Sequence, residues 1–366
     1  MDADFEQAKH DFLAGVAALQ AGRFEDAERL FLASLEQVPG RASTLINLAA
    51  TRLQLGRPVD ALEAANQALG AEPDDIDATL HRATALAQLG RHDDALRAFD
   101  NLLALSPRLA MAWSHRGGIL REMGRLDEAA RSFEQAVAHG ADPHLHAYYL
   151  AAVGAGKAPD TAPAPYVRAL FDGYAGQFDE HLVGVLGYRA PSVLAAHVGR
   201  LSRRRFDSAL DLGCGTGLCG PLLKPASNRL TGIDLSGAML EKAEALGVYG
   251  ELVRADIVEY LHSTEHRFDL VVAADVFIYL GDLDPVFAGV RRVLGSGGVF
   301  CFSAELPAGD IDGFMLLPSL RYAHSQRYLR GLASRHGFEV DRVWQEPIRE
   351  DQKVPVDALY VSLARG

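Results

Sequence analysis

The chain has 366 residues, of which 49% are hydrophobic, and a formal net charge of −12 at pH 7, so we expect two or three globular domains. The acidic balance argues against nucleic acid as a partner, because phosphate binding requires a basic face. The sequence has no apolar run long enough to span a membrane, no export leader and only 3 cysteines, so we expect a cytoplasmic protein without a disulfide framework.

The first part of the chain repeats itself between residues 8 and 143, with a step of 34 residues. Gly-Arg pairs begin at positions 22, 56, 90 and 124, and alanine recurs at 27, 61, 95 and 129. Pro39, Pro73 and Pro107 close three of the four units. Each unit predicts two antiparallel helices, because small residues allow close approach and proline stops the second helix. This pattern resembles the tetratricopeptide repeat.

Stacked helix pairs of this kind build a groove, and we expect it to bind a protein or peptide. A second reading is that the repeats serve only as a scaffold for assembly, and the oligomeric state stays open. Residues 1–150 contain 22 acidic and 14 basic side chains, a net charge of −8. This balance favours a basic or neutral partner segment.

Composition marks the boundary between two domains. Residues 151–165 are rich in glycine, proline and alanine and are predicted to be a linker. Residues 1–150 then form the repeat domain, with a capping helix at its end, and 166–366 form the second domain. Early in that domain an aromatic stripe at helical spacing predicts a core-facing helix, with a lid over a ligand as the alternative. The stripe consists of Phe171, Tyr174 and Phe178.

The second domain is organised around residues 209–218, Ala-Leu-Asp-Leu-Gly-Cys-Gly-Thr-Gly-Leu. A short apolar strand leads into three alternate glycines, and a helix is predicted to begin at Leu218 and reach Lys224. Glycines at a strand end allow a sharp turn and close approach of the backbone to a ligand. The layout is that of a nucleotide-type site in a doubly wound sheet.

Four more apolar segments predict parallel strands separated by helices. They span residues 229–235, 251–256, 268–276 and 297–303. Acidic residues end three of them, at Asp234, Asp256 and Asp275. An acid about twenty residues beyond the glycine loop can hold both hydroxyls of a ribose, which is the position of Asp234.

The run from Leu210 to Gly217 resembles the first motif of class I S-adenosylmethionine-dependent methyltransferases, and the three acids fall where the later motifs of that family lie. With the repeats and the segment 171–182, the chain is similar to a group of bacterial predicted methyltransferases that carry tetratricopeptide repeats. The resemblance implies a two-domain fold. The N-terminal part is an all-α solenoid, and the C-terminal part is a Rossmann-like α/β domain with a seven-stranded, mostly parallel sheet.

The resemblance also implies S-adenosylmethionine as cofactor and gives roles to individual residues. The glycine loop would lie under the methionine part of the cofactor, with the preceding acid facing its amino group: Asp211, Gly213, Cys214, Gly215 and Gly217. Asp234 would bind the ribose, and Leu235, Met239, Asp256 and Ile257 would surround the adenine. Ala274 and Asp275 would lie beside the sulfonium.

The sulfonium methyl is already electrophilic, so a general base is needed only for an acceptor that arrives protonated. The candidates are Asp275, Tyr279, Tyr322 and His324. Arg349 could pair an acceptor carboxylate, although an exposed arginine is usually only solvated. No metal site is expected. The fourth strand lacks the Asn-Pro-Pro-aromatic run of amide- and adenine-nitrogen methyltransferases, which argues against those acceptors.

The sequence therefore predicts a methyltransferase whose acceptor is a protein or peptide recruited by the repeats. Two alternatives stay open. The first is a small-molecule methyltransferase whose repeats mediate assembly. The second is a non-catalytic interaction protein that keeps the cofactor fold. The intact glycine loop and Asp234 argue against the second alternative, because a fold without cofactor does not need them.

Overall fold

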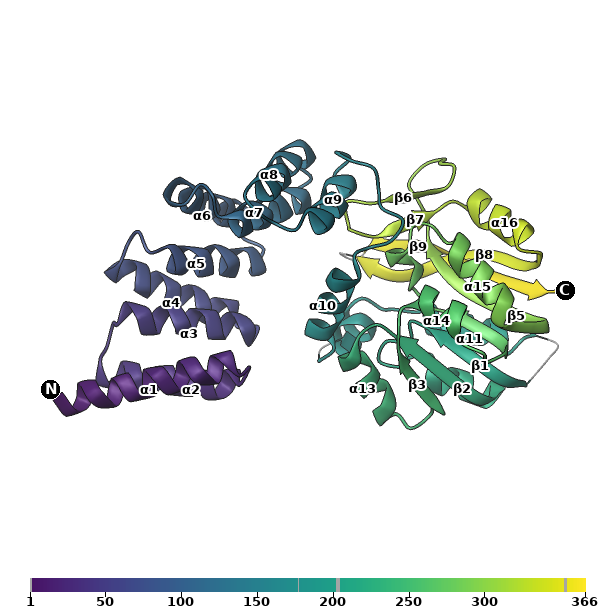
Figure 1. Ribbon diagram of the computed structural model, residues 1–366, viewed down its shortest axis with the longest axis horizontal. Coiled ribbons are helices and arrows are strands. Elements are labelled where there is room, and N and C mark those ends of the chain that lie inside the picture. Colours follow the sequence, from purple (N-terminus) through teal and green to yellow (C-terminus); the bar gives the residue numbers. More distant parts are fainter. Residues whose placement is uncertain (1, 177, 202–204, 352–353) are drawn as a thin grey trace. The chain divides into compact units, whose positions relative to one another are not determined.

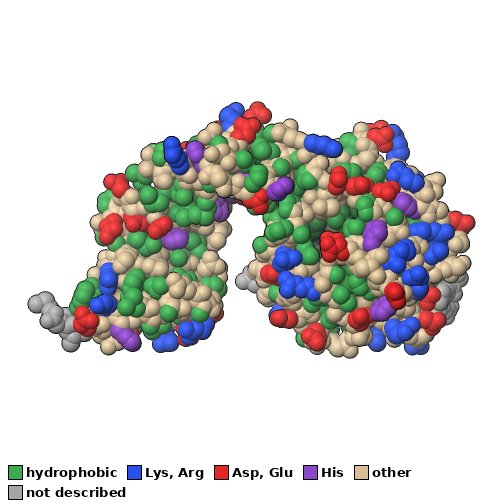
Figure 2. Space-filling view, viewed as in Figure 1, with side chains coloured by type: hydrophobic (Ala, Val, Ile, Leu, Met, Phe, Trp, Pro, Cys, Tyr) green, Lys and Arg blue, Asp and Glu red, His purple; other side chains and the backbone are tan. Residues whose placement is uncertain are grey.

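A computed structural model describes residues 2–176, 178–201, 205–351 and 354–366 (Figure 1). The chain forms two compact units, residues 1–156 and 157–366. Within the described ranges, no helix combines the length and apolar character that a membrane crossing requires. Acidic, basic and hydrophobic side chains are interspersed over the visible face of each unit (Figure 2).

The first unit consists of helices stacked in antiparallel pairs (Figure 1). The four pairs and a final helix are α1 Asp2–Gln20 with α2 Phe24–Gln37, α3 Ala42–Gln54 with α4 Pro58–Ala71, α5 Ile76–Gln88 with α6 His92–Leu105, α7 Ala110–Glu122 with α8 Leu126–Ala138, and α9 Pro143–Ala152. The predicted solenoid of four helix pairs with a capping helix is confirmed.

The periodic residues explain why these pairs form. The glycine of each Gly-Arg turn has a positive φ, between 68° and 73°, which ends the first helix without strain. Close packing follows from small residues opposite aromatic ones. A Cβ atom added at Gly117 would lie 2.5 Å from the Phe133 ring, and one at Gly15 would lie 2.7 Å from Phe31. The second helices of the first three pairs each end two residues before a proline.

The second unit contains a seven-stranded sheet with the order β3-β2-β1-β4-β5-β9-β8. Its strands are β1 Phe206–Leu212, β2 Ser227–Asp234, β3 Glu251–Arg254, β4 Phe268–Ala273, β5 Leu294–Glu305, β8 Phe338–Asp351 and β9 Val354–Arg365. The first five are parallel, and β9 and β8 add an antiparallel edge. The strand order reverses at β1 and β4, the switch point at which ligands bind in doubly wound sheets. The predicted mostly parallel seven-stranded sheet is confirmed.

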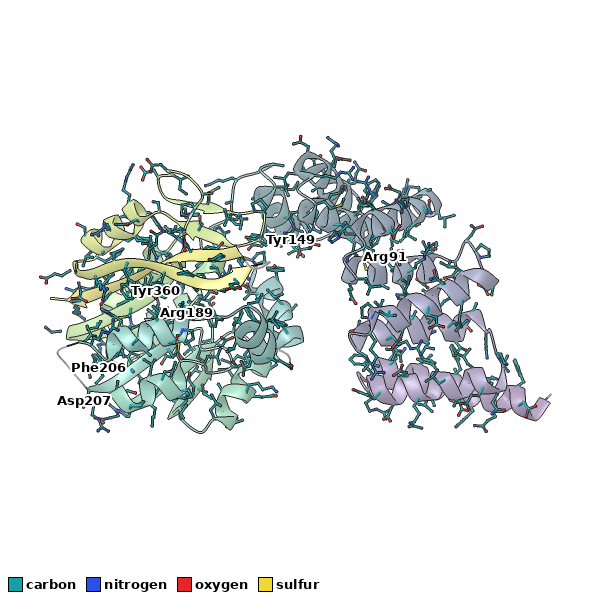
Figure 3. The ribbon with its side chains drawn as sticks, turned by 180° about the vertical axis from the view of Figure 1, so that it is seen from behind. Arg91, Tyr149, Arg189, Phe206, Asp207 and Tyr360 are labelled. Atoms are coloured by element: carbon teal, nitrogen blue, oxygen red, sulfur yellow. The ribbon has the colours of Figure 1, made fainter. Side chains whose placement is uncertain are left out.

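Helices cover both faces of this sheet. The remaining elements are α10 Ala164–Tyr174, the π-helix η1 Glu180–Val185, α11 Ala190–Val198, α12 Gly220–Leu223, η2 Lys224–Ala226, α13 Gly237–Ala245, α14 Ile257–Ser263, η3 Phe277–Tyr279, α15 Asp284–Val293, the hairpin β6 Phe314–Leu316 with β7 Tyr322–His324, and α16 Gln326–Arg335. Leu210 and Leu212 of β1 pack with α14, α15 and α16, whereas Ala209 packs with α11 and α12. The α11 face also holds Tyr360 of β9, labelled in Figure 3. Successive side chains of β1 point to opposite faces of the sheet, so this strand contributes to two hydrophobic cores.

The predicted linker, residues 151–165, does not behave as a free tether. Its first two residues belong to α9, and α10 begins at Ala164. Between them, the Asp160 carbonyl accepts hydrogen bonds from the Gly281 and Asp282 amides at 2.8 and 2.9 Å. Thr161 forms a β-bridge with Leu280. Backbone pairing that sequence composition does not reveal therefore fixes the second half of this segment to the second unit.

The helix predicted from Leu218 to Lys224 is shorter in the structure than the sequence suggested. It is reduced to one turn, α12, followed by a single 3-10 turn. Pro225 explains this, because proline lacks the amide hydrogen that a continuing helix requires.

Candidate active site

A cavity of about 400 Å³ opens at the carboxyl ends of β1, β2 and β4, in the second unit. Gly213, Cys214 and Gly215 line it from the loop after β1, and Asp234 and Leu235 line it from the end of β2. This is the sheet edge on which the switch point lies. The cavity therefore brings together the glycine loop and the first acid that the sequence singled out.

Glycine is required in the loop by both backbone angle and space. Gly213 has φ +64°, and a Cβ atom added there would lie 2.3 Å from Val276 Cγ2. Gly217 has φ +89°, and its Cβ atom would lie 2.9 Å from Leu246 Cδ1. Any side chain at Gly213 would collide with the segment after β4, so the loop can lie this close to β4 only without one.

Asp234 closes the loop onto β2. Its carboxylate accepts hydrogen bonds from the Gly215 amide and the Ser236 amide, both at 2.9 Å. Burial raises the pKa of Asp234, while these backbone donors act in the opposite direction. Ser236 caps α13 and donates to Asp172 of α10 at 2.5 Å. The acid is thus held rigidly at the cavity wall, with α10 tied beside it.

Asp211 lies beneath the loop and is buried. The Tyr249 hydroxyl donates a hydrogen bond of 2.7 Å to Asp211 Oδ2. Burial raises the pKa of Asp211 to about 7, although the Tyr249 hydrogen bond favours the charged form. Sequence reasoning did not single out Tyr249, because nothing local marks a partner that lies 38 residues away.

The other predicted cofactor residues divide into two groups. Those that line the cavity with the loop are Asp256, Ile257 and Ala274. Asp256 also caps α14 through hydrogen bonds from the Val258 and Glu259 amides. Asp211, Gly217 and Met239 lie outside the lining, and Met239 is fully buried. The Met239 side chain is therefore not on the surface of the cavity in this structure.

The aromatic stripe forms one wall of the cavity. Phe171, Tyr174 and Phe178 all line it, and α10 contains no buried residue. The Phe171 ring packs against Tyr279 edge to face, with centroids 5.4 Å apart. The core-facing interpretation of the stripe was therefore wrong, and the lid alternative agrees with these positions.

Asp275 lines the cavity and has an unusual backbone conformation. It has φ +56°, which is strained for a residue with a side chain and typical of functional sites. Its amide donates to Ser303 Oγ at 2.8 Å. Burial raises its pKa to about 7, against the opposing charge of Arg321. Its Oδ1 atom is buried and finds no hydrogen-bond partner among the described residues.

Arg349 is not the exposed, solvated side chain that its sequence position suggested. Its side chain is 5% exposed and lies between two acids. Its Nη1 atom is 3.3 Å from Asp275 Oδ2, and its Nη2 atom is 2.7 Å from Glu305 Oε2. Because two carboxylates already hold the buried Arg349 guanidinium, Arg349 orients Asp275 and is not available to pair the carboxylate of an acceptor.

Two of the four candidate bases do not line the cavity. The Tyr322 hydroxyl donates to the Pro159 carbonyl at 2.7 Å, and His324 Nε2 lies 3.0 Å from the Gly281 carbonyl. Neither lines the cavity, whereas Asp275 and Tyr279 do. Burial lowers the pKa of His324 to about 4, so its imidazole is neutral near pH 7. Tyr322 and His324 are structural residues of the β7 region.

Sequence reasoning missed Arg321, which lines the same cavity. Its guanidinium lies 4.0 Å from Glu305 Oε2. Arg321 comes between two short strands without any motif, so no sequence signal could have found it.

A family model described as a methyltransferase domain matches residues 210–302, and two tetratricopeptide repeat models match residues 18–85 and 80–146. The chain therefore joins tetratricopeptide repeats to a class I S-adenosylmethionine-dependent methyltransferase domain. The cavity described above lies within that domain.

Curated relatives match less than half of this chain. The malonyl-[acyl-carrier protein] O-methyltransferase of Pseudescherichia vulneris is 31% identical over 171 residues, which are 44% of this chain and 63% of the relative. The Salmonella typhimurium protein of the same name is 31% identical over 157 residues, 43% of this chain and 57% of its own length. The chain thus spans less than two thirds of these relatives.

Among solved structures, the magnesium protoporphyrin IX methyltransferase of Synechocystis with bound S-adenosylmethionine is 15% identical, with a TM-score of 0.44. The match covers 56% of this chain and 97% of that structure. Nothing about the acceptor follows from so distant a likeness.

Proposed function

We propose that this protein transfers the methyl group of S-adenosylmethionine to an acceptor on a protein or peptide that the repeat unit recruits. The observation that supports this most is the single cavity that joins the two halves of such a reaction. One half is the glycine loop with Asp234. The other is an aromatic wall with Asp275 and Tyr279. Bound together in one cavity, cofactor and acceptor would be held in line for transfer, and a protein group would take part only by accepting a proton from an acceptor that arrives protonated.

In the cofactor half, the loop from Gly213 to Gly217 would support the methionine part, and Asp234 would accept hydrogen bonds from the ribose hydroxyls. Asp256, Ile257 and Leu235 would surround the adenine. Asp211 would act from beneath, as a buried negative charge that favours the cofactor's ammonium. The chemistry that the cofactor supplies is an electrophilic methyl group.

In the acceptor half, the aromatic side chains of α10 would exclude water from the reacting atoms. Asp275 would accept a proton from an acceptor that arrives protonated, since a carboxyl with a pKa of about 7 is half ionised at neutral pH. Among the described residues that line the cavity, Arg321 is the only basic one. It favours an acceptor that carries negative charge near the reacting atom.

A protein-borne acceptor is favoured by the fusion to tetratricopeptide repeats, which in general bind protein segments. The names of the two relatives are in accord with this, since they describe a malonyl group attached to a carrier protein. A free small molecule, with repeats used for assembly, is the competing possibility.

The cofactor half is tested by calorimetric titration of the full chain with S-adenosylmethionine and with its demethylated product. We expect Asp234→Ala to weaken binding by more than about tenfold, because it removes acceptors for two hydroxyl groups. Asp207→Ala is the matched control. Asp207 is exposed at the opposite end of β1, where it accepts a hydrogen bond from Asn228 (Figure 3). Absence of binding by the intact, folded protein would overturn the catalytic proposal.

The acceptor half is tested by incubating the full chain with cell extract and methyl-labelled cofactor. Label on macromolecules with the wild type, but not with Asp234→Ala, is the expected result. Label confined to the small-molecule fraction would instead establish the competing possibility.

A further inference from the structure

The repeat unit has a cavity of its own, of about 220 Å³, between α4, α5 and α6. Arg82 reaches it from α5, and Arg91 and Arg97 reach it from the start of α6. Figure 3 labels Arg91 on this unit. The repeat symmetry allows this cavity to be compared with the equivalent place one repeat later.

One repeat later, the equivalent of Arg82 is Arg116, and its guanidinium is paired with two side chains. Its Nε atom donates to Asp100 Oδ1 at 2.8 Å, and its Nη1 atom donates to Ser132 Oγ at 2.8 Å. The Arg116 side chain is 20% exposed. An arginine at this place in the repeat is thus satisfied by a carboxylate from the preceding repeat and a hydroxyl from its own.

Both of these partners are missing around Arg82. A shift of 34 residues places Asn66 at the position of Asp100 and Ala98 at the position of Ser132. No hydrogen bond or ion pair joins Arg82 to another residue within the described ranges. Arg82 is half-buried and faces the cavity, so the missing carboxylate leaves a guanidinium with unused donors.

The neighbouring side chains add to the positive charge of the cavity. Arg91 and Arg97 both pair with the same residue, Asp94, and Arg91 Nη2 lies 2.6 Å from its Oδ2 atom. One acid therefore serves two arginines, and with Arg82 the cavity has a net charge of +2. This local sign is opposite to the net charge of the whole repeat domain. The expectation of a basic or neutral partner segment rested on the charge of the whole domain, and the charge of this cavity has the opposite sign.

We propose that this cavity binds an acidic side chain, from an aspartate or glutamate in an extended segment of a partner protein. The bound carboxylate would take the place that Asp100 occupies one repeat later. Buried Leu86 and Ala98 line the cavity and fit the aliphatic stem of such a side chain, which a bare phosphate lacks. Exposed Asn66 and Asn101 offer amide groups to the peptide backbone on either side.

This inference goes beyond the proposed methyl transfer, since the acidic segment can be bound whether or not it carries the methylated group. Its test therefore uses no cofactor. The probe is a fluorescent eight-residue peptide of alternating glycine and glutamate, titrated with the full chain at low salt. The same peptide with glutamine in place of glutamate is the control ligand. Binding of the glutamate peptide only is expected.

Arg82→Gln is expected to weaken binding of the glutamate peptide at least tenfold, because a bidentate charge-assisted contact is lost. Arg108→Gln is the matched control, since Arg108 is exposed and outside the cavity. Asp234→Ala in the other unit should bind the peptide normally, so a failure of this inference and a failure of the catalytic proposal are distinguishable.

A second variant guards against loss of folding. Asn66→Asp with Ala98→Ser restores the two partners that Arg116 has, so we expect an unchanged or raised Tm together with loss of peptide binding. Unchanged peptide binding in this double variant, or in Arg82→Gln, would overturn the proposal. So would inorganic phosphate that displaces the peptide at equal concentration, because the cavity would then be a phosphate site.

Discussion

The two halves of the cavity, to which we assign the cofactor and the acceptor, are built in different ways. The cofactor half comes from main chain and from acids at the ends of adjacent strands, and its central contact joins the Gly215 amide to Asp234. The acceptor half comes from side chains on α10, η3 and the segment that contains Arg321, which are far apart in the sequence. A binding surface made of main chain has its shape set by the fold, so it fits one shape of ligand. A surface made of side chains can change its ligand without a change of fold. We therefore expect substitutions in the cofactor half to reduce S-adenosylmethionine affinity more than substitutions in the acceptor half.

Gly213→Ala should have the largest effect on cofactor affinity. The new methyl group would meet Val276 Cγ2 at 2.3 Å and would also hold a side chain at φ +64°. Displacement of the loop should reduce S-adenosylmethionine affinity more than about a hundredfold and destabilise the fold by about 1 to 3 kcal/mol. Calorimetry and thermal unfolding measure the two effects.

Gly247→Ala separates backbone strain from collision. Gly247 has φ +63°, and a Cβ atom added there meets nothing within 4 Å. The free energy of unfolding of this variant should fall only by the strain of the left-handed backbone, about 1 to 2 kcal/mol. Its cofactor affinity should be that of the wild type. Equal cofactor affinity of Gly213→Ala and Gly247→Ala would show that the cofactor half is not determined by main-chain shape.

The difference between contiguous segments and contacts of distant segments also decides what could be predicted from the sequence. The repeats and the glycine loop are periodic or contiguous, so their residues imply their own geometry. Arg349 reaches Asp275 only because β8 pairs with β9 at the antiparallel edge of the sheet. Tyr322 was misread for a related reason, since its partner is a carbonyl in the segment taken to be a linker. Contacts between distant segments depend on strand order and backbone pairing, and residue types alone do not reveal them.

Arg349→Met tests the support of the acceptor half. The variant leaves the carboxylates of Asp275 and Glu305 without the cation that lies between them, at side-chain exposures of 10% and 9%. We expect a loss of about 3 to 5 kcal/mol in the free energy of unfolding, the typical cost when one partner of a buried ion pair is removed. Denaturant titration measures it.

Arg327→Met is the matched control for this loss. Arg327 lies 3.6 Å from Asp310, but the two side chains are 66% and 90% exposed. Removal of such an exposed pair should change the free energy of unfolding by less than about 0.5 kcal/mol. Equal effects of the two variants would mean that Arg349 is not held between its acids in solution.

Tyr249→Phe should have the smallest effect, and its sign depends on pH. The variant removes the hydroxyl that donates to buried Asp211, whose pKa is about 7. Hydrogen bonds to a charged acceptor are roughly twice as strong as those to a neutral one. The variant should therefore cost about 2 kcal/mol at pH 8, where Asp211 is ionised, and about 1 kcal/mol at pH 5, where it is protonated.

The folding stability that Asp211 contributes also depends on pH. Asp211 in the folded protein binds its proton more tightly than in the unfolded chain, so folding stability due to this group falls as pH rises from about 4 to 7. Loss of the Tyr249 donor raises the folded pKa further and extends that fall above pH 7. Tyr360→Phe is the control, since the Tyr360 hydroxyl is buried without a hydrogen-bond partner in the described part of the chain. Its removal should be neutral or stabilising at both pH values. An equal loss of folding stability in Tyr249→Phe at pH 5 and pH 8 would mean that Asp211 keeps one protonation state over this range. Its proposed role as a charge beneath the cofactor's ammonium would then require that state to be the ionised one.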